Sequence, residues 1–105
     1  MDNKKDIIKK LREFKKNIIN IKVNKIIFFG SRVYGKFNKD SDIDLVIVSK
    51  NFEGKKFRYR SVGLYKYWNL DYPVDFLCYT PEEFNKLKKQ ITIVRQAVME
   101  GIEIK

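Results

Sequence analysis

The first segment of the chain places apolar residues three and four positions apart, with lysines between them. Ile7, Leu11, Phe14 and Ile18 fall on one helical face. This spacing is typical of an amphipathic helix that buries a single apolar stripe. It predicts a helix over about Lys4 to Asn20.

Three short apolar runs are typical of strands. They are Ile26 to Phe29, Ile43 to Val48 and Val74 to Tyr79. Each run is bounded by turn-forming residues, and the first two are rich in the β-branched and aromatic side chains of buried strands. The polar segment Lys36 to Ser41 predicts a turn between the first two strands.

The aromatic segment at residues 51–72 fits no single period. Leu64 and Trp68 are four positions apart with Tyr65 between them, which favours a helix from about Tyr59 to Asn69. An aromatic cluster of this kind is more often packing than a platform for stacking bases, so we expect these three side chains to lie in a core or an interface.

The last third of the chain carries helix signals. Thr80-Pro81-Glu82-Glu83 has the composition of a capping box and predicts a helix to about Lys89. A second apolar stripe runs from residue 91 to Gly101, where the helix is expected to stop. Ile102 to Ile104 could then form a short edge strand.

Helices and strands therefore alternate along the chain, in the order helix, strand, short helix, strand, helix, strand, two helices and strand. This order predicts an α/β or α+β sandwich in which helices flank a small mixed central sheet. At 105 residues the chain is expected to form one domain, residues 1–105, around one sheet.

Composition limits the chemistry. Histidine is absent, which excludes imidazole catalysis and histidine-containing zinc sites. Cys78 is the only cysteine, lies in an apolar run, and is expected to be a core residue. The formal net charge of +10 favours anionic partners but does not identify them, and a solvated lysine-rich surface explains it equally well. No apolar run approaches the roughly 20 residues of a membrane helix, and we expect a soluble cytoplasmic protein.

The stretch from Gly30 to Lys36 has the glycine and lysine spacing of a P-loop. A P-loop requires a hydroxyl after the lysine and a long helix starting there, whereas this chain offers Phe37 and then a turn. A calcium loop beginning at Asp40 also fails, because leucine and asparagine stand where glycine and glutamate are needed.

A different arrangement remains. Gly30-Ser31 ends a predicted strand and opens a short helix, which suits the binding of a phosphate. Ten residues later Asp42 and Asp44 stand two apart on a strand, so both carboxylates point to one face. Asp75 stands in the next strand-like run. Three acids on apolar strands repel one another unless a cation such as Mg²⁺ compensates their charge. The alternative is that Asp42 caps a turn and Asp75 pairs with a lysine.

Gly30-Ser31, the ten-residue gap, Ser41-Asp42-Ile43-Asp44-Leu45 and the later Asp75 resemble the signature of the DNA polymerase β superfamily of nucleotidyltransferases. The chain is similar to its minimal nucleotidyltransferases, small catalytic domains that often act as antitoxins beside HEPN-domain toxins. Relatives often read Gly-Ser-Arg-Ala-Arg-Gly. Here Arg32 and Gly35 match, whereas Val33 and Tyr34 depart from that pattern.

The resemblance implies a mechanism and a set of site residues. Gly30, Ser31 and Arg32 would bind the triphosphate of ATP. Asp42, Asp44 and Asp75 would be the catalytic residues and would hold one or two Mg²⁺ ions. The reaction would transfer AMP from ATP to a hydroxyl.

The partner that the resemblance implies is a HEPN-domain toxin, which this chain would adenylylate as an antitoxin. One alternative is RNA or a small molecule as acceptor; it is not favoured, because relatives that modify such substrates generally add a further domain. Another is a binding module that neutralises its partner by occlusion without catalysis.

Overall fold

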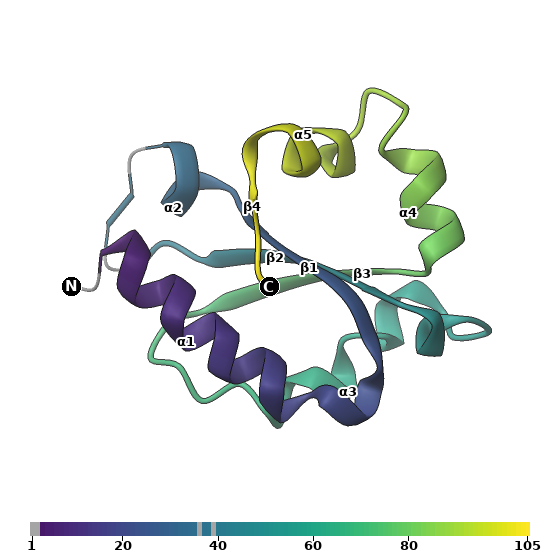
Figure 1. Ribbon diagram of the computed structural model, residues 1–105, viewed down its shortest axis with the longest axis horizontal. Coiled ribbons are helices and arrows are strands. Elements are labelled where there is room, and N and C mark those ends of the chain that lie inside the picture. Colours follow the sequence, from purple (N-terminus) through teal and green to yellow (C-terminus); the bar gives the residue numbers. More distant parts are fainter. Residues whose placement is uncertain (1–2, 36, 39) are drawn as a thin grey trace.

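A computed structural model describes residues 3–35, 37–38 and 40–105. Helices lie on both faces of a four-stranded sheet (Figure 1). The elements in chain order are α1 Lys4–Asn17, β1 Val23–Phe29, α2 Ser31–Tyr34, β2 Ile43–Ser49, α3 Val62–Tyr65, β3 Val74–Tyr79, α4 Pro81–Leu87, α5 Ile93–Glu100 and β4 Ile102–Glu103, with 3-10 turns at Ile19–Ile21, Lys50–Phe52 and Phe57–Tyr59.

The sheet is mixed, as predicted. Its strand order is β3-β2-β1-β4. β1 pairs antiparallel with both β2 and β4, whereas β2 and β3 run parallel. β4 is a short edge strand, in agreement with the prediction for Ile102 to Ile104. Parallel β2 and β3 begin at the same end of the sheet, and this end carries Asp44 and Asp75.

Alternate strand residues supply two apolar layers, one on each face of the sheet. Ile26, Phe28 and Leu45 pack with α1 and α3 on one face. Ile27 and Val46 pack with Phe84 of α4 and with α5 on the other. The central strands are therefore apolar on both sides, which explains why their sequences are nearly continuous hydrophobic runs.

The first helix forms as predicted but ends earlier. The Asn3 side chain caps it by accepting a hydrogen bond of 2.9 Å from the backbone N–H of Asp6. The helix ends at Asn17 rather than near Asn20, and a 3-10 turn follows. Lys22, with φ 57° and ψ 53°, then adopts a left-handed conformation that redirects the chain into β1.

The helix predicted over Tyr59 to Asn69 is the least accurate expectation. Only Val62–Tyr65 is α-helical, after a separate 3-10 turn at Phe57–Tyr59. The buried Arg60 lies between them, and its guanidinium donates to the backbone carbonyls of Lys55 and Cys78 at 2.9 and 3.2 Å. These tertiary contacts fix the backbone here, which a local periodicity cannot anticipate.

The expected packing of the aromatic segment is confirmed for Leu64 and Trp68 but only in part for Tyr65. Leu64 is buried. The Trp68 ring meets Phe14 edge-on at 5.2 Å between centroids, and its indole N–H donates to the Tyr72 carbonyl at 2.8 Å. Tyr65 is half-exposed but contacts Phe76 edge-on at 5.0 Å.

The capping box at Thr80 is also confirmed. The Thr80 hydroxyl accepts from the Glu83 N–H, and the Glu83 carboxylate accepts from the Thr80 N–H. The helix ends at Leu87 rather than Lys89. A new cap at Thr92 then opens α5, because its hydroxyl accepts from the Arg95 N–H at 3.2 Å.

Cys78 lies in the core, as expected. It is 2% exposed, and burial raises the pKa of its thiol to about 12. A thiol with such a pKa stays protonated near neutrality and is a poor nucleophile.

In the described part of the chain, none of the helices has both the length and the apolar character that crossing a membrane requires.

Candidate active site

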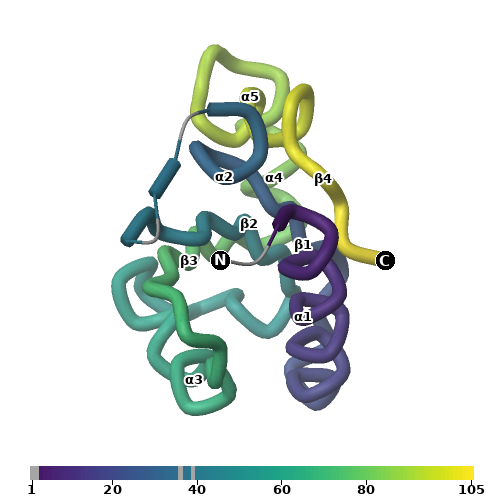
Figure 2. The backbone as a smooth tube through the Cα atoms, turned by 90° about the vertical axis from the view of Figure 1, so that its left-hand side faces the viewer, coloured from purple at the N-terminus to yellow at the C-terminus, as the bar shows by residue number. Residues whose placement is uncertain are grey.

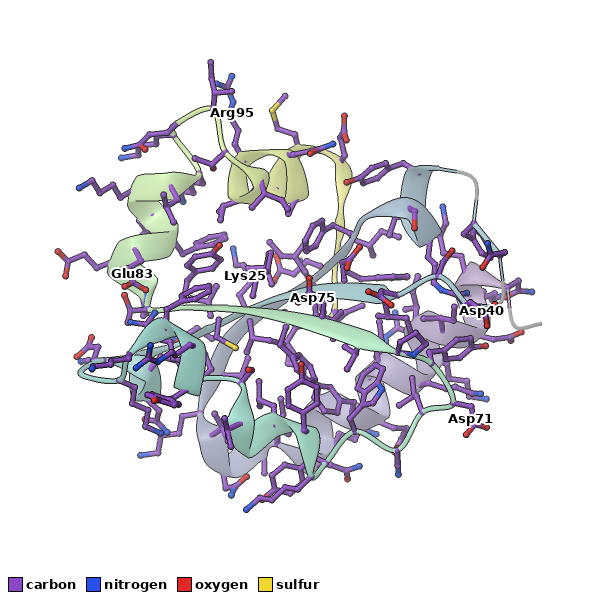
Figure 3. All side chains as sticks on the ribbon, turned by 180° about the vertical axis from the view of Figure 1, so that it is seen from behind. Lys25, Asp40, Asp71, Asp75, Glu83 and Arg95 are labelled. Atoms are coloured by element: carbon purple, nitrogen blue, oxygen red, sulfur yellow. The ribbon has the colours of Figure 1, made fainter. Side chains whose placement is uncertain are left out.

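The three predicted acids lie at the end of the sheet where β2 and β3 begin, and Asp44 and Asp75 share one face. Asp44 and Asp75 are partners in the parallel register of the two strands. Both carboxylates project toward the side of α4 and α5, because they alternate with residues of the opposite apolar layer. Figure 3 labels Asp75 on β3. Asp42 precedes Asp44 by two residues and lies immediately before β2. Asp42 and Asp75 are exposed and Asp44 is half-buried, so a substrate could reach all three.

The surroundings of Asp44 raise the pKa of its carboxyl group. Burial, together with the negative charges of Asp75 and Asp42, raises the pKa of Asp44 from 3.8 to about 6. Burial is the largest cause, and the two carboxylates add to it. The site therefore favours a bound proton or a cation at Asp44.

Gly30 lies directly against this carboxyl group. Its φ of +88° is in the region that favours glycine, and a Cβ at this position would meet Asp44 Oδ2 at 2.1 Å. Both the backbone conformation and the space available therefore exclude a side chain. This contact places the residue after β1 against Asp44 of β2. It explains why the Gly30-Ser31 motif begins with glycine.

Ser31 begins the four-residue helix α2 directly after Gly30. The backbone N–H groups of Val33 and Tyr34 bond to the Gly30 carbonyl at 3.0 and 3.3 Å, which closes the turn. Amides at the start of a helix have no acceptor within the helix, so a phosphate oxygen can serve as one. Ser31 is the first residue of this helix and is partly exposed, so its hydroxyl is available to the same phosphate.

Arg32 points into the protein instead of toward a ligand. It is 1% exposed, and its guanidinium donates to the carbonyls of Ser41 and Asn38 at 2.8 and 3.1 Å. The rings of Tyr72 and Phe37 lie 4.6 and 5.0 Å from it. Arg32 thus fastens α2 to the turn that leads into Asp42. This geometry favours a positioning role over the nucleotide contact expected from the sequence.

Tyr72 was not identified as a site residue from the sequence. It contacts Arg32 only because β3 lies beside β2, and Arg32 and Tyr72 are forty residues apart in the chain. No local motif indicates this contact. Lys36, the P-loop-like lysine, lies outside the described residues.

A divalent cation fits the chemistry of the site in part. Its oxygens come from carboxylates, the ligands that Mg²⁺ prefers, and repulsion at Asp44 favours a positive charge there. Within the described ranges, however, no three acidic, histidine or cysteine side chains form a group that could hold a metal ion. The ligand set of Asp42, Asp44 and Asp75 stays a prediction. Mg²⁺ commonly uses one or two protein carboxylates with water and substrate phosphates, and these acids could supply such a set.

The family is identified by comparison with known proteins. The sequence pattern of the nucleotidyltransferase domain matches residues 4–98. The chain therefore belongs to the nucleotidyltransferase domain family. This match includes all three acids and the Gly30-Ser31 turn.

A relative agrees with this family assignment, and a solved structure is similar in fold. Over 72 residues the chain is 31% identical to the "Putative protein adenylyltransferase MJ0141" of Methanocaldococcus jannaschii, a match that covers 66% of this chain and 73% of the relative. A crystal structure titled as a putative nucleotidyltransferase from Sulfolobus solfataricus superposes with a TM-score of 0.64 at 18% identity, covering 91% of this chain and 77% of that one. The structural match confirms the fold.

Proposed function

We propose that the protein is an adenylyltransferase that moves AMP from ATP to a hydroxyl group of a partner protein. The observation that carries the proposal is the position of Asp44 opposite Asp75 and against Gly30. The printed name of the Methanocaldococcus jannaschii relative supports ATP as the nucleotide and a protein as the acceptor. The partner we propose is a HEPN-domain toxin, with this chain as its antitoxin, on the resemblance drawn from the sequence.

In the proposed reaction the acceptor oxygen forms a bond to the α-phosphorus of ATP. The bond from that phosphorus to the β-phosphate bridging oxygen breaks, and pyrophosphate leaves. Asp75 is exposed and would accept the hydroxyl proton. The turn at Gly30-Ser31 would hold the triphosphate through backbone N–H groups. Asp42 and Asp44 would hold Mg²⁺, which when bound neutralises charge on the phosphates.

The test compares Asp42→Asn and Asp44→Asn with the unchanged protein. Each is incubated with labelled ATP, Mg²⁺ and the candidate HEPN partner, while melting temperature is followed in parallel. Both variants should lose transfer and keep or gain stability, because each substitution removes one of several repelling charges. Asp71→Asn is the control, since Asp71 is an exposed acid in the loop before β3 and away from the site (Figure 3).

Other results would support the alternatives. A variant that loses stability by about 0.5 to 2 kcal/mol while transfer continues would indicate a cap or an ion pair instead of a catalytic acid. Labelling of RNA and not of protein would indicate the alternative acceptor. Tight partner binding without any transfer by the unchanged protein would indicate occlusion.

A further inference from the structure

A basic groove lies along α1, on a different part of the molecule from the acids. Its volume is about 460 Å³. Figure 2 shows the C-terminal end of the chain beside α1, where the groove is formed. We define the basic groove by the residues that line it: Lys9, Arg12, Glu13, Lys15, Lys16, Ile18, Ile19, Lys22, Val23 and Lys105.

The charge of the basic groove is strongly one-sided. Six of its ten lining residues are lysine or arginine, whereas Glu13 is its only acidic side chain. Glu13 lies 3.4 Å from Lys16, so its charge is already offset. The groove therefore presents a positive field that a partner's carboxylates could neutralise.

An apolar side chain stands among these charges. Ile19 is 79% exposed in the 3-10 turn after α1. It contributes little to the core of this chain, although the neighbouring Ile18 is fully buried. An exposed isoleucine within a cavity offers an apolar contact to whatever occupies that cavity.

The backbone at this point is held in an unfavourable conformation. Lys22 is the only non-glycine residue with positive φ in the described part of the chain. The buried Ser49 hydroxyl donates to the carbonyl of Ile21 at 2.9 Å and is 3.3 Å from that of Lys22, which fixes the turn. Such strain persists where surrounding structure enforces it, and it is concentrated at functional sites. Here it directs Lys22 and Val23 into the groove.

The groove is distant from the acids. Val23 begins β1 and Phe29 ends it beside Asp44. At about 3.3 Å per residue the two ends of this strand are roughly 20 Å apart. A partner bound in the groove would therefore leave the candidate active site open.

We propose that the basic groove docks an acidic, amphipathic segment of a partner protein. Its carboxylates would face the cations, and its apolar side chains would contact Ile19 and Val23. A nucleic-acid strand fits less well, because none of the described residues that line the groove is aromatic and could stack on bases. Binding of such a segment in the basic groove does not require nucleotide transfer.

The experiment measures binding of a fluorescein-labelled helical peptide of about 14 residues, with leucines on one face and glutamates on the other. The full chain is titrated without ATP or Mg²⁺, so the result does not depend on the proposed function. Reversal of two groove charges, Lys9→Glu with Arg12→Glu, should weaken binding about tenfold. Ile19→Ser should weaken it about threefold and leave the melting temperature unchanged, since the side chain is exposed.

The matched control is Lys86→Glu with Lys89→Glu, which reverses two exposed lysines in and just after α4 and should change binding by less than about twofold. Equal loss in this control would show attraction by net charge alone and overturn the proposal. So would the absence of peptide binding, or binding of a single-stranded RNA oligomer more tightly than the peptide with the same sensitivity to Lys9→Glu and Arg12→Glu. A peptide with lysines in place of glutamates should not bind.

Discussion

Asp44 shows how one side chain is shaped by its neighbours. It is paired in register with Asp75, it lies against Gly30, and it follows Asp42 by two residues. Each of these contacts makes its ionised form less favourable or leaves it no room to turn away. A group in this situation is suited to binding a cation, and its titration should be visible in the stability of the protein.

The first prediction concerns pH. The pKa of Asp44 is raised from 3.8 to about 6 by burial and by the two neighbouring carboxylates, so between these values the folded state holds a proton that the unfolded state has lost. The free energy of unfolding should therefore fall as pH rises from about 4 to about 6. Because Asp44 is only partly buried, solvent screening reduces the expected loss to about 1 kcal/mol.

Urea unfolding in EDTA across this pH range provides the measurement, with Asp44→Asn as the comparison. The variant should lack this part of the slope and be the more stable protein above pH 6. An identical pH dependence in both proteins would contradict the assignment.

The second prediction concerns Arg32. Arg32→Lys removes the planar group that binds two carbonyls and stacks on Tyr72, so the free energy of unfolding should fall by about 2 kcal/mol. The Kd for ATP should change little while kcat for transfer falls, because the arginine is buried and its hydrogen bonds position the turn before Asp42. Fluorescence titration with a labelled ATP analogue, together with kcat and KM, separates the two roles. A large increase in Kd at unchanged stability would show a direct nucleotide contact.

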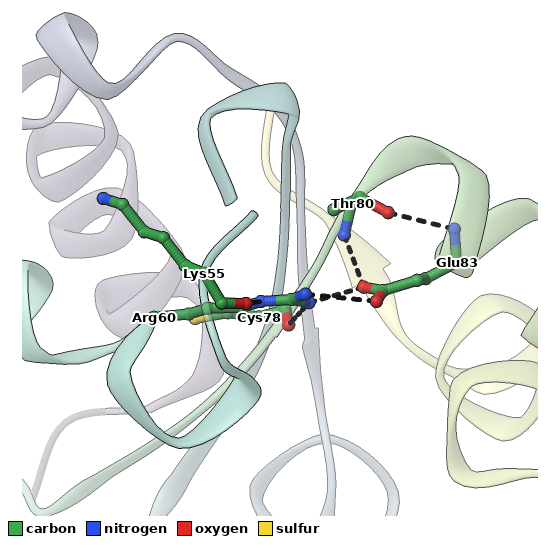
Figure 4. Close-up of polar contacts among 5 residues, drawn as sticks. All are labelled: Lys55, Arg60, Cys78, Thr80 and Glu83. Carbon is green, nitrogen blue, oxygen red and sulfur yellow. Dashed lines mark hydrogen bonds and ion pairs between the residues drawn. The ribbon is translucent and has the colours of Figure 1, made fainter. Parts of the chain in front are cut away.

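Between elements, the contact of Arg60 with Glu83 joins the irregular segment before β3 to the start of α4. The two side chains form a bidentate ion pair, with one N–O distance of 3.1 Å, and Arg60 also binds the Lys55 and Cys78 carbonyls (Figure 4). The hydrogen bond from Arg60 is the main reason that the pKa of Glu83 is lowered. One side chain thus connects three pieces of chain: the segment before Arg60, β3 and the start of α4.

The third prediction follows from this connection. Arg60→Ala should lower the free energy of unfolding by about 2 to 4 kcal/mol, because it removes the donor to two carbonyls and the cation paired with the Glu83 carboxylate. Glu83→Gln should cost less, about 1 kcal/mol, since glutamine can still accept from the Thr80 N–H and Glu83 is partly exposed. Chemical denaturation measures both. Arg58→Ala, at an exposed neighbour, is the control and should have almost no effect.

Over the complete chain, charge opposes compactness. The formal net charge is +10, and six of the lysine and arginine side chains line the basic groove. Repulsion of this kind lowers the stability of the folded state and is screened by salt.

The fourth prediction is that added salt stabilises the protein. Raising NaCl from about 20 to about 200 mM should increase the melting temperature by about 4 °C, equivalent to roughly 1 kcal/mol. Lys86→Glu with Lys89→Glu reduces the net charge by four and should show a smaller increase. A melting temperature that falls with salt would show that attractive ion pairs outweigh the repulsion.

Much of the architecture follows from local patterns. The bounds of β3 and the capping box at Thr80 agree with the structure, because a strand's period and a helix cap each depend on a few neighbouring residues. The site motif could be predicted for the same reason, because Gly30-Ser31 and Asp42-x-Asp44 lie within one short stretch of chain. The order of helices and strands, and hence the fold class, could be predicted on the same basis.

Contacts between distant segments required the folded structure. Arg32 turns inward because Tyr72 comes beside it, and the helix predicted from Tyr59 is interrupted because Arg60 binds a carbonyl of β3. The pairing of Asp44 with Asp75 depends on the register of two parallel strands. The basic groove forms only when the end of the chain lies against α1. Each of these features joins residues far apart in sequence, and their positions are set by packing across the sheet, which no local pattern of residues records.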